Sequence, residues 1–325
     1  MTRSLVTGAA GFVGANLTRR LLQQGGAVHL LLRPGRDRWR IADLADQVQI
    51  HDADLADREA VRRVLREARP EQVFHLAAYG TYSTQQDPEC MVRTNLLGTT
   101  TLLDASADAG VAAFVYTGSS SEYGFKRTPA SESDLLAPNS QYAITKAAAT
   151  HYCQHLARHR DLHAVTLRLY SIYGPWEDRS RLMPVLLTHA LRGGWPSLAA
   201  SASAHDFVYV DDAVDAILTA ASRRSVPRGA VYNVCTGVET SLADVVTEIR
   251  QILDVRAAPQ WDTMPARSWD TDRWVGAPDA IARDLGWRAV TALRAGLQST
   301  IAWLQADAGR LEYYAWRASE PPTPS

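Results

Sequence analysis

The chain has 325 residues, of which 46% are hydrophobic and 21% are charged, so it is long enough to bury a large core in one or two domains. Its formal net charge of −1 gives no electrostatic basis for binding nucleic acid or an anionic membrane surface. No apolar run is long enough to span a bilayer, no signal peptide is visible, and the three widely spaced cysteines match no disulfide or metal-ligand pattern. We therefore expect a cytoplasmic protein without a metal site.

The first predicted element is a buried strand at residues 4–6 that runs into a glycine-rich turn, T-G-A-A-G-F-V-G at 7–14, followed by a helix. Strand, glycine turn and helix together are typical of a dinucleotide-binding site, with a purely structural turn as the alternative. Gly8 permits the tight turn, Gly11 lets the backbone approach a pyrophosphate, and Gly14 lets the helix pack closely on the strand. The positive end of the helix would hold the phosphates. The expected cofactor contacts are Gly8, Ala10, Gly11, Phe12, Val13 and Gly14.

Residues 28–32 predict a second buried strand, and Arg33 follows it. At this position a dinucleotide-binding fold usually has the residue that reads the adenosine ribose, and an acidic residue there accepts hydrogen bonds from the 2′-hydroxyl. Arg33 is instead followed by Arg36, Arg38 and Arg40, and a guanidinium suits a 2′-phosphate, which it can bind through two hydrogen bonds. We expect NADP(H) to be slightly favoured, with NAD(H) possible and a solvated basic loop as the alternative.

Strand and helix patterns continue to alternate, which predicts an α/β fold. The next predicted strands are residues 48–55, 73–78, 113–117 and 165–169, and the predicted helices are residues 57–68, 87–109 and 141–158. The strand at 73–78 ends in small residues, and small side chains at the carboxyl edge of a parallel sheet leave room for a flat ligand.

Three residues carry the candidate chemistry: Ser119 at the end of a strand, and Tyr142 and Lys146 one turn apart on the following helix. A free tyrosine has a pKa of about 10 and is a poor base at neutral pH. A nearby ammonium and the positive ring of an oxidised nicotinamide would favour the phenolate. Ser119 would then orient a substrate hydroxyl or carbonyl during hydride transfer. Y-x-x-x-K alone is more often a surface pair, but its position after this serine and the glycine turn favours a site.

After residue 169 the alternation weakens and proline and tryptophan become frequent, which predicts a second lobe over the carboxyl edge of the sheet. We expect a dinucleotide-binding domain over 1–170, to which segments near 205–235 return, a mainly substrate-binding lobe over 171–310, and a disordered tail over 311–325. The predicted elements in this half are strands at 207–210 and 231–234 and helices at 212–222 and 241–253.

An ordered series of short motifs runs along the chain. After the glycine turn it consists of D-A-D-L at 52–55, H-L-A-A at 75–78, N-L-L-G-T at 95–99, S-S-S-E-Y-G at 119–124, Y-A-I-T-K at 142–146, L-R-L-Y-S-I-Y-G-P at 167–175, R-L-M-P at 181–184, H-D-F-V-Y-V-D-D at 205–212 and Y-N-V-C-T-G at 232–237. With this series the chain resembles extended short-chain dehydrogenase/reductases of the nucleotide-sugar epimerase, dehydratase and reductase branch. The ordered set is more specific than any single motif.

The resemblance implies a Rossmann-type doubly wound parallel sheet with a smaller C-terminal lobe. It implies that Tyr142 is the general base, Lys146 its partner and a ligand of the cofactor ribose, and Ser119 the third catalytic residue. The other cofactor contacts that it implies are Asp54, Leu55, Leu76, Ala77, Ala78, Asn95, Thr117 and Tyr170. Such enzymes are usually homodimers joined through two helices per subunit, which would lie here near 90–109 and 142–158.

The loops expected around the sugar depart from one branch of the family. In dehydratase relatives an acidic residue pair follows the catalytic hydroxyl, whereas a gapless match places Ser120 and Ser121 there. Glu122 lies one residue later, and sliding the loop would restore an acid near the substrate. Tyr79 and Tyr82, after the fourth strand, would either contact the hexose or simply complete their loop.

The expected diphosphate site also departs from the family pattern. His205 stands where the family usually has an arginine, and Ser171 and Arg181 stand where it has asparagines. We therefore expect diphosphate binding to have shifted to Arg181 and Arg267.

The sequence thus predicts NAD(P)-dependent hydride transfer at C4 of a nucleoside-diphosphate hexose, by a 4-epimerase or a 4-ketosugar reductase. One alternative is a 4,6-dehydratase, and a second is a non-catalytic NAD(P)-binding sensor on the same fold. A tightly bound oxidised cofactor would indicate an epimerase or dehydratase, whereas a reductase would have to be supplied with NADPH.

Overall fold

The computed structural model describes residues 1–82, 84–263 and 273–315. Within these residues, parallel strands form a seven-stranded central sheet in the order β10-β6-β5-β4-β1-β2-β3. The strands are β1 (Arg3–Thr7), β2 (Ala27–Leu32), β3 (Gln49–Asp52), β4 (Gln72–His75), β5 (Ala113–Ser119), β6 (His163–Leu169) and β10 (Val231–Val234). The inner strands are almost continuously buried, as expected when helices cover both faces of a parallel sheet.

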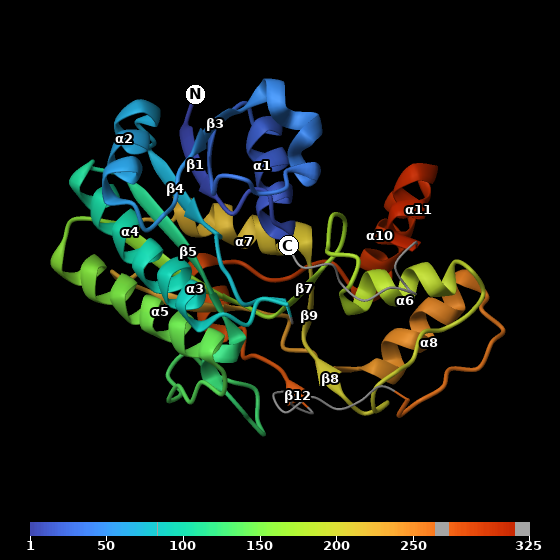
Figure 1. Ribbon diagram of the computed structural model, residues 1–325. Helices are drawn as coiled ribbons and strands as arrows, with labels where there is room; N and C mark the ends of the chain where they lie inside the picture. The colour runs from blue at the N-terminus through green and yellow to red at the C-terminus, as the bar shows by residue number, and fades with distance from the viewer. Residues whose placement is uncertain (83, 264–272, 316–325) are drawn as a thin grey trace.

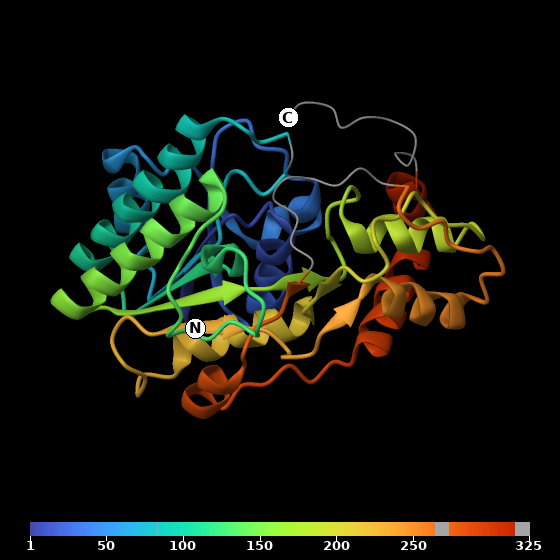
Figure 2. The same ribbon diagram turned by 90° about the horizontal axis from the view of Figure 1, so that it is seen from below.

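Helices lie on both faces of the central sheet (Figures 1 and 2). One face carries α1 (Phe12–Gln23), α7 (Val210–Ser222) and α9 (Asp279–Leu285), and the other carries α2 (Arg58–Ala68), α4 (Gly98–Asp108) and α5 (Gln141–His159). Local capping fixes where two of these helices begin, because Asp57 accepts hydrogen bonds from the first turn of α2 and Ser140 accepts one from Ala143 N in α5. This arrangement is the Rossmann-type fold that the resemblance implies.

The helix predicted over 87–109 consists of three consecutive parts. They are α3 (Pro88–Met91), the π-helix η2 (Val92–Leu97) and α4. A π-helical turn within a helix often marks a functional site. Two 3-10 helices connect strands to the elements that follow them: η1 (Trp39–Gln47) after β2 and η3 (Ser120–Tyr123) after β5.

A second lobe lies beside the sheet, at the right of Figure 1. Its helices are α6 (Leu182–Ala190), α8 (Leu242–Leu253), α10 (Leu293–Gln305) and α11 (Ala308–Ala315), and they share one apolar cluster. The remaining strands are β7 (Ser171–Tyr173) paired with β9 (Phe207–Tyr209), and β11 (Thr240–Ser241), β8 (Ala204–His205) and β12 (Arg273–Trp274) in a three-stranded sheet. Among the described helices, none is long and apolar enough to cross a membrane.

The strands and helices predicted in the first half of the chain are confirmed, with boundaries that move by a few residues. In the second half, β10 joins the central sheet beside β6, whereas β9 pairs with β7 outside that sheet. The predicted division of the chain at residue 170 stays a prediction.

The predicted disordered tail is wrong for residues 311–315, which belong to helix α11. The reason is aromatic packing. Tyr313 and Tyr314 contact the ring of Trp39, and the buried hydroxyl of Tyr314 donates to the carbonyl of Glu177 at 2.7 Å. The rest of the predicted tail, residues 316–325, lies outside the described residues.

Candidate active site

A cavity of about 1270 Å³ opens at the carboxyl edge of the central sheet, between the sheet and the second lobe. The turn after β1 lines it, and β1 lies between β4 and β2, where the strand order reverses. Ligands of doubly wound folds bind at this reversal point. A pocket for one small ligand measures about 300–1,000 Å³, so this cavity has room for a dinucleotide and a second molecule.

The glycine turn has the shape of a phosphate cradle. Gly8 has a φ of +73°, and a Cβ on it would lie 2.6 Å from the backbone nitrogen of Ala77. A Cβ on Gly14 would overlap the carbonyl of Gly8. Helix α1 follows Gly11, whose N-cap position has no side-chain hydrogen bond among the described residues, so the first N–H groups of the helix are available to an anion. The backbone of this turn therefore fits the diphosphate of a dinucleotide.

The arginines after β2 divide into two groups. Arg33 and Arg36 line the cavity, whereas Arg38 pairs with Asp52. Arg40 is buried and donates to the carbonyl of Trp176 at 2.7 Å. Only the first two arginines are therefore positioned to meet a ligand.

The other predicted cofactor contacts lie at or beyond the carboxyl ends of the central strands, and they line the same cavity with one exception. Those on its wall are Asp54, Leu55, Leu76, Ala77, Ala78, Thr117 and Tyr170. Asp54 also pairs with Arg93, with 2.9 Å between its Oδ2 and the guanidinium.

The exception is Asn95, which the structure positions behind the cavity wall. Its amide oxygen accepts from Tyr79 N at 2.8 Å, and its amide nitrogen donates to the carbonyl of Tyr79 and the hydroxyl of Thr145. Because both ends of this buried amide are occupied, Asn95 orients the loop of Tyr79 instead of lining the cavity.

Ser119, Tyr142 and Lys146 meet on the wall of the cavity that the glycine turn lines. The Lys146 ammonium donates to the carbonyl of Thr117 at 2.6 Å and lies 4.3 Å from the ring centroid of Tyr116. Burial lowers the pKa of Lys146 to about 8. It raises the pKa of Tyr142 to about 12, although a hydrogen bond with Ser119 acts in the opposite direction.

These two pKa values define what the site needs before it can abstract a proton. At neutral pH the Tyr142 phenol keeps its proton, and the Lys146 ammonium is charged but close to its titration range. A positive charge brought into the cavity lowers the pKa of a phenol. A cation in the cavity would therefore favour the Tyr142 phenolate.

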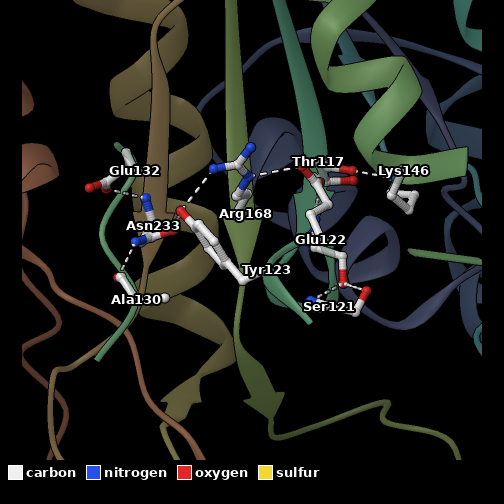
Figure 3. Close-up of polar contacts among 10 residues, drawn as sticks. Thr117, Ser121, Glu122, Tyr123, Ala130, Glu132, Lys146, Arg168 and Asn233 are labelled. Carbon is white, nitrogen blue, oxygen red and sulfur yellow. Dashed lines mark hydrogen bonds and ion pairs between the residues drawn. The ribbon is translucent and has the colours of Figure 1, made fainter. Parts of the chain in front are cut away.

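The structure of the serine loop, residues 119–123, shows that the prediction of Glu122 as a substrate contact is wrong. Ser119, Ser120 and Ser121 line the cavity, and the hydroxyls of Ser119 and Ser121 lie 2.7 Å apart. Glu122 is fully buried and points away from the cavity, into an ion pair with Arg168 at 2.8 Å (Figure 3). The ion pair holds Glu122 on the side of the loop that faces Arg168. Glu122 is therefore neither a substrate contact nor an acid for elimination.

The predicted substrate residues lie around the lobe side of the cavity. Tyr79, Tyr82, Ser171, Arg181 and His205 all line it. The guanidinium of Arg181 lies 5.7 Å from the ring centroid of Tyr82, and the side chains of Ser171 and His205 are 3.4 Å apart. Arg267 lies outside the described residues.

The cavity wall also contains residues that the sequence analysis does not name as site residues. They include Gln85, Met91, Glu177, Asp178, Met183 and Phe207. Glu177 is buried, and its Oε2 has no hydrogen-bond partner among the described residues. The sequence gives only a weak signal for it, an acidic pair directly after the G-P-W turn at 174–176.

Comparisons with known proteins agree with this geometry. Residues 4–235 match the model of the NAD dependent epimerase/dehydratase family. The chain is 33% identical over 310 residues to the UDP-glucose 4-epimerase of Mycolicibacterium smegmatis, covering 92% of this chain and 97% of that protein. It is 31% identical over 321 residues to the dTDP-glucose 4,6-dehydratase of Streptomyces griseus, covering 93% and 94%.

Two solved structures are similar over nearly the whole chain. The Thermus thermophilus UDP-glucose 4-epimerase in complex with NAD has a TM-score of 0.82 and 29% identity, covering 94% of this chain and 99% of that one. MoeE5 in complex with UDP-glucose and NAD has a TM-score of 0.81 and 30% identity, covering 93% and 98%.

Proposed function

The chain belongs to the NAD dependent epimerase/dehydratase family, and from this premise we propose that it is a 4-epimerase of nucleoside-diphosphate hexoses. It is an enzyme of the extended short-chain dehydrogenase/reductase type. The observation that supports the proposal most is the position of Ser119, Tyr142 and Lys146 on one cavity wall with the glycine turn. The similarity to a UDP-glucose 4-epimerase over 92% of the chain also supports it.

Each of the three residues has a proposed task. The nicotinamide cofactor supplies a hydride acceptor and donor when it is bound. Tyr142 Oη would take the proton of the sugar C4 hydroxyl when C4 is oxidised and would return it when C4 is reduced. Lys146 favours the phenolate through its positive charge, and Ser119 donates a hydrogen bond to the C4 oxygen. Reduction from the opposite face of C4 would invert that carbon.

A 4,6-dehydratase is less well supported than a 4-epimerase. Elimination of water across C5 and C6 needs an acid and a base close to the sugar in addition to the catalytic tyrosine. The described acidic residues that line the cavity are Asp54, Glu177 and Asp178, and none of them belongs to the serine loop. Glu122, the acid of that loop, is engaged by Arg168.

A 4-ketosugar reductase is the second candidate, and it rests on Arg33 and Arg36. Both line the cavity beyond β2, where a 2′-phosphate would lie. They support binding of NADP(H), although the similar structures named above contain NAD. We expect that replacing both arginines with alanine weakens NADP⁺ binding at least tenfold and changes NAD⁺ binding little, as measured by calorimetry. Equal losses for both cofactors would exclude this role.

The direct test is incubation of the purified protein with UDP-glucose, dTDP-glucose, CDP-glucose and GDP-mannose, and in a separate reaction with NADPH and a nucleoside-diphosphate 4-ketosugar. A 4-epimerase gives the C4 epimer without net consumption of cofactor, and denaturation releases an oxidised dinucleotide. A reductase oxidises NADPH stoichiometrically with a 4-ketosugar, and a dehydratase product has lost one water. Tyr142→Phe should lower the rate of whichever reaction the parent catalyses by about 10²-fold or more, while cofactor binding persists. Identical behaviour of this variant and the parent would favour the sensor.

We propose further that the chain forms a homodimer through η2 and α5. Large apolar side chains are exposed on these two helices: Val92, Leu97 and Ile144 are 43%, 51% and 54% exposed. Burying them against a second copy would remove apolar surface from water. The double variant Leu97→Lys/Ile144→Lys should be monomeric in light scattering. The control Val290→Lys, at a residue outside both helices that is 83% exposed, should not change the mass. A monomeric parent would refute the proposal.

A further inference from the structure

We propose that Glu122 and Arg168 form a positioning pair that holds the serine loop and sets the pH range in which the site works. The proposal rests on the function proposed above, because it assigns Ser119, Tyr142 and Lys146 to catalysis. Neither Glu122 nor Arg168 touches the cavity, so both act through those three residues. The pair is drawn in Figure 3.

Glu122 joins the catalytic serine to the next strand. One carboxylate oxygen accepts from the backbone nitrogen of Ser119 at 2.8 Å, and the other receives Arg168 Nε at 2.8 Å. The Glu122 and Arg168 side chains are 0% and 4% exposed. Gly118 makes the space for this carboxylate, because a Cβ there would lie 2.6 Å from Glu122 Oε1. The position of Ser119 therefore depends on a charged group behind it.

Arg168 is itself fixed by a chain of hydrogen bonds across the sheet. Its Nη1 donates to the Tyr123 hydroxyl at 2.8 Å, and that hydroxyl donates to Asn233 Oδ1 at 2.8 Å. Asn233 Nδ2 donates to the carbonyl of Ala130 at 2.9 Å. Figure 3 shows these side chains in a row that crosses β6 and β10. Arg168 is bound by Tyr123 on the side opposite Glu122. If Glu122 moved away, the buried guanidinium would therefore be left without a counter-charge.

The negative charge of Glu122 acts on both titrating residues of the site. It raises the pKa of Lys146, against the larger effect of burial, and it also raises the pKa of Tyr142. The other ionisable groups facing Lys146 are His75 on β4, Tyr116 on β5, and Cys153 on α5 itself. Tyr142 also faces Arg181 from the lobe, which lowers its pKa.

Glu122 is the only carboxylate that acts on both Lys146 and Tyr142 among the described residues. His75 is buried and neutral, because burial lowers its pKa to about 3. The thiol of Cys153 is also neutral, because burial raises its pKa to about 12. Glu122 is thus the buried charge that favours the Lys146 ammonium, because it raises the pKa that burial lowers.

The first test is Glu122→Gln, which keeps an oxygen for the Ser119 N–H but removes the charge and leaves Arg168 unpaired. Both changes make the surroundings more positive, so the pKa values of Tyr142 and Lys146 should both fall. We expect both limbs of the pH profile of kcat/KM to move to lower pH by about one unit. Neutralising Arg168 as well, in Glu122→Gln/Arg168→Gln, should bring the profile part of the way back.

Two further variants distinguish the effect of the Glu122 charge from two other effects, the position of its carboxylate and a general loss of stability. Glu122→Asp keeps the charge but withdraws it by one methylene, so kcat should fall about tenfold while the pH limbs stay in place. Asp212→Asn removes another buried carboxylate, which accepts from Thr291 N at 2.9 Å, and should lower stability without moving the pH profile. If Glu122→Gln does not fold, Glu122→Asp decides: a kcat equal to that of the parent would overturn the proposal.

A second readout needs no substrate and therefore separates this proposal from the proposed function. The ultraviolet titration of Tyr142, taken as the difference between the parent and Tyr142→Phe with NAD⁺ bound, should have its midpoint about one unit lower in the Glu122→Gln background. If this midpoint moves while no nucleotide sugar turns over, the proposed function fails and the positioning pair stands. A folded Glu122→Gln variant with the parent's midpoint would refute the pair.

Discussion

Glu177 makes a specific prediction about how stability depends on pH. Its side chain lies in the cavity wall, it is 7% exposed, and its Oε2 lacks a hydrogen-bond partner among the described residues. Burial raises the pKa of Glu177 from 4.5 to about 8. The nearby Arg181 acts in the opposite direction without cancelling this effect. The folded protein therefore keeps a proton on Glu177 at neutral pH.

The sign of the effect follows from proton binding in the two states. Between pH 4.5 and about 8 the folded state holds a proton that the unfolded state has released, so the free energy of unfolding falls as pH rises. At about 1.36 kcal/mol per unit the full span is worth roughly 5 kcal/mol. Water in the cavity relieves part of the burial, and we expect about 2 kcal/mol.

Replacing Glu177 with glutamine should remove this pH-dependent loss. The free energy of unfolding should be measured in urea at pH 5 and at pH 8. Relative to the parent, Glu177→Gln should be about 2 kcal/mol more stable at pH 8 than at pH 5. The matched control is Glu59→Gln, at a side chain that is 78% exposed, which should follow the parent at both. If the free energy of unfolding of Glu177→Gln changes with pH as it does in the parent, the Glu177 carboxyl is ionised in the folded protein and the reasoning is wrong.

Three further substitutions probe the cradle and the lobe. Gly14→Ala should weaken NAD⁺ binding at least tenfold in calorimetry and cost about 1–3 kcal/mol, because the new Cβ overlaps the Gly8 carbonyl; unchanged affinity would contradict the close packing of α1. Tyr314→Phe should lower the free energy of unfolding in urea by about 1 kcal/mol, because the hydrogen bond to the backbone carbonyl of Glu177 is lost. An unchanged free energy of unfolding would mean that α11 does not pack against this part of the chain. Asp206→Asn should cost about 2–4 kcal/mol, because its carboxylate accepts from Thr236 N and Gly237 N at 2.7 and 2.9 Å; a thermal shift below 2 °C would contradict this.

The sequence alone determined the local parts of the site. The glycines of the turn after β1, the small residues after β4, and the tyrosine and lysine one turn apart on α5 are all set by short-range spacing. Apolar runs and helical periods likewise fixed most of the central sheet, because parallel strands that are buried on both faces leave a plain apolar signal. Local stereochemistry is sufficient for such features, and the order of the motifs was sufficient to recognise the family.

Only the tertiary structure decided which charged side chains face the cavity. Arg33 and Arg40 belong to the same basic stretch, yet the first lines the cavity and the second is buried against the carbonyl of Trp176. Glu122 follows the catalytic serine closely in sequence, but it pairs with Arg168, which is 46 residues away. A buried charge takes the direction in which a partner satisfies it, and that partner comes from a distant strand or lobe that no local pattern encodes.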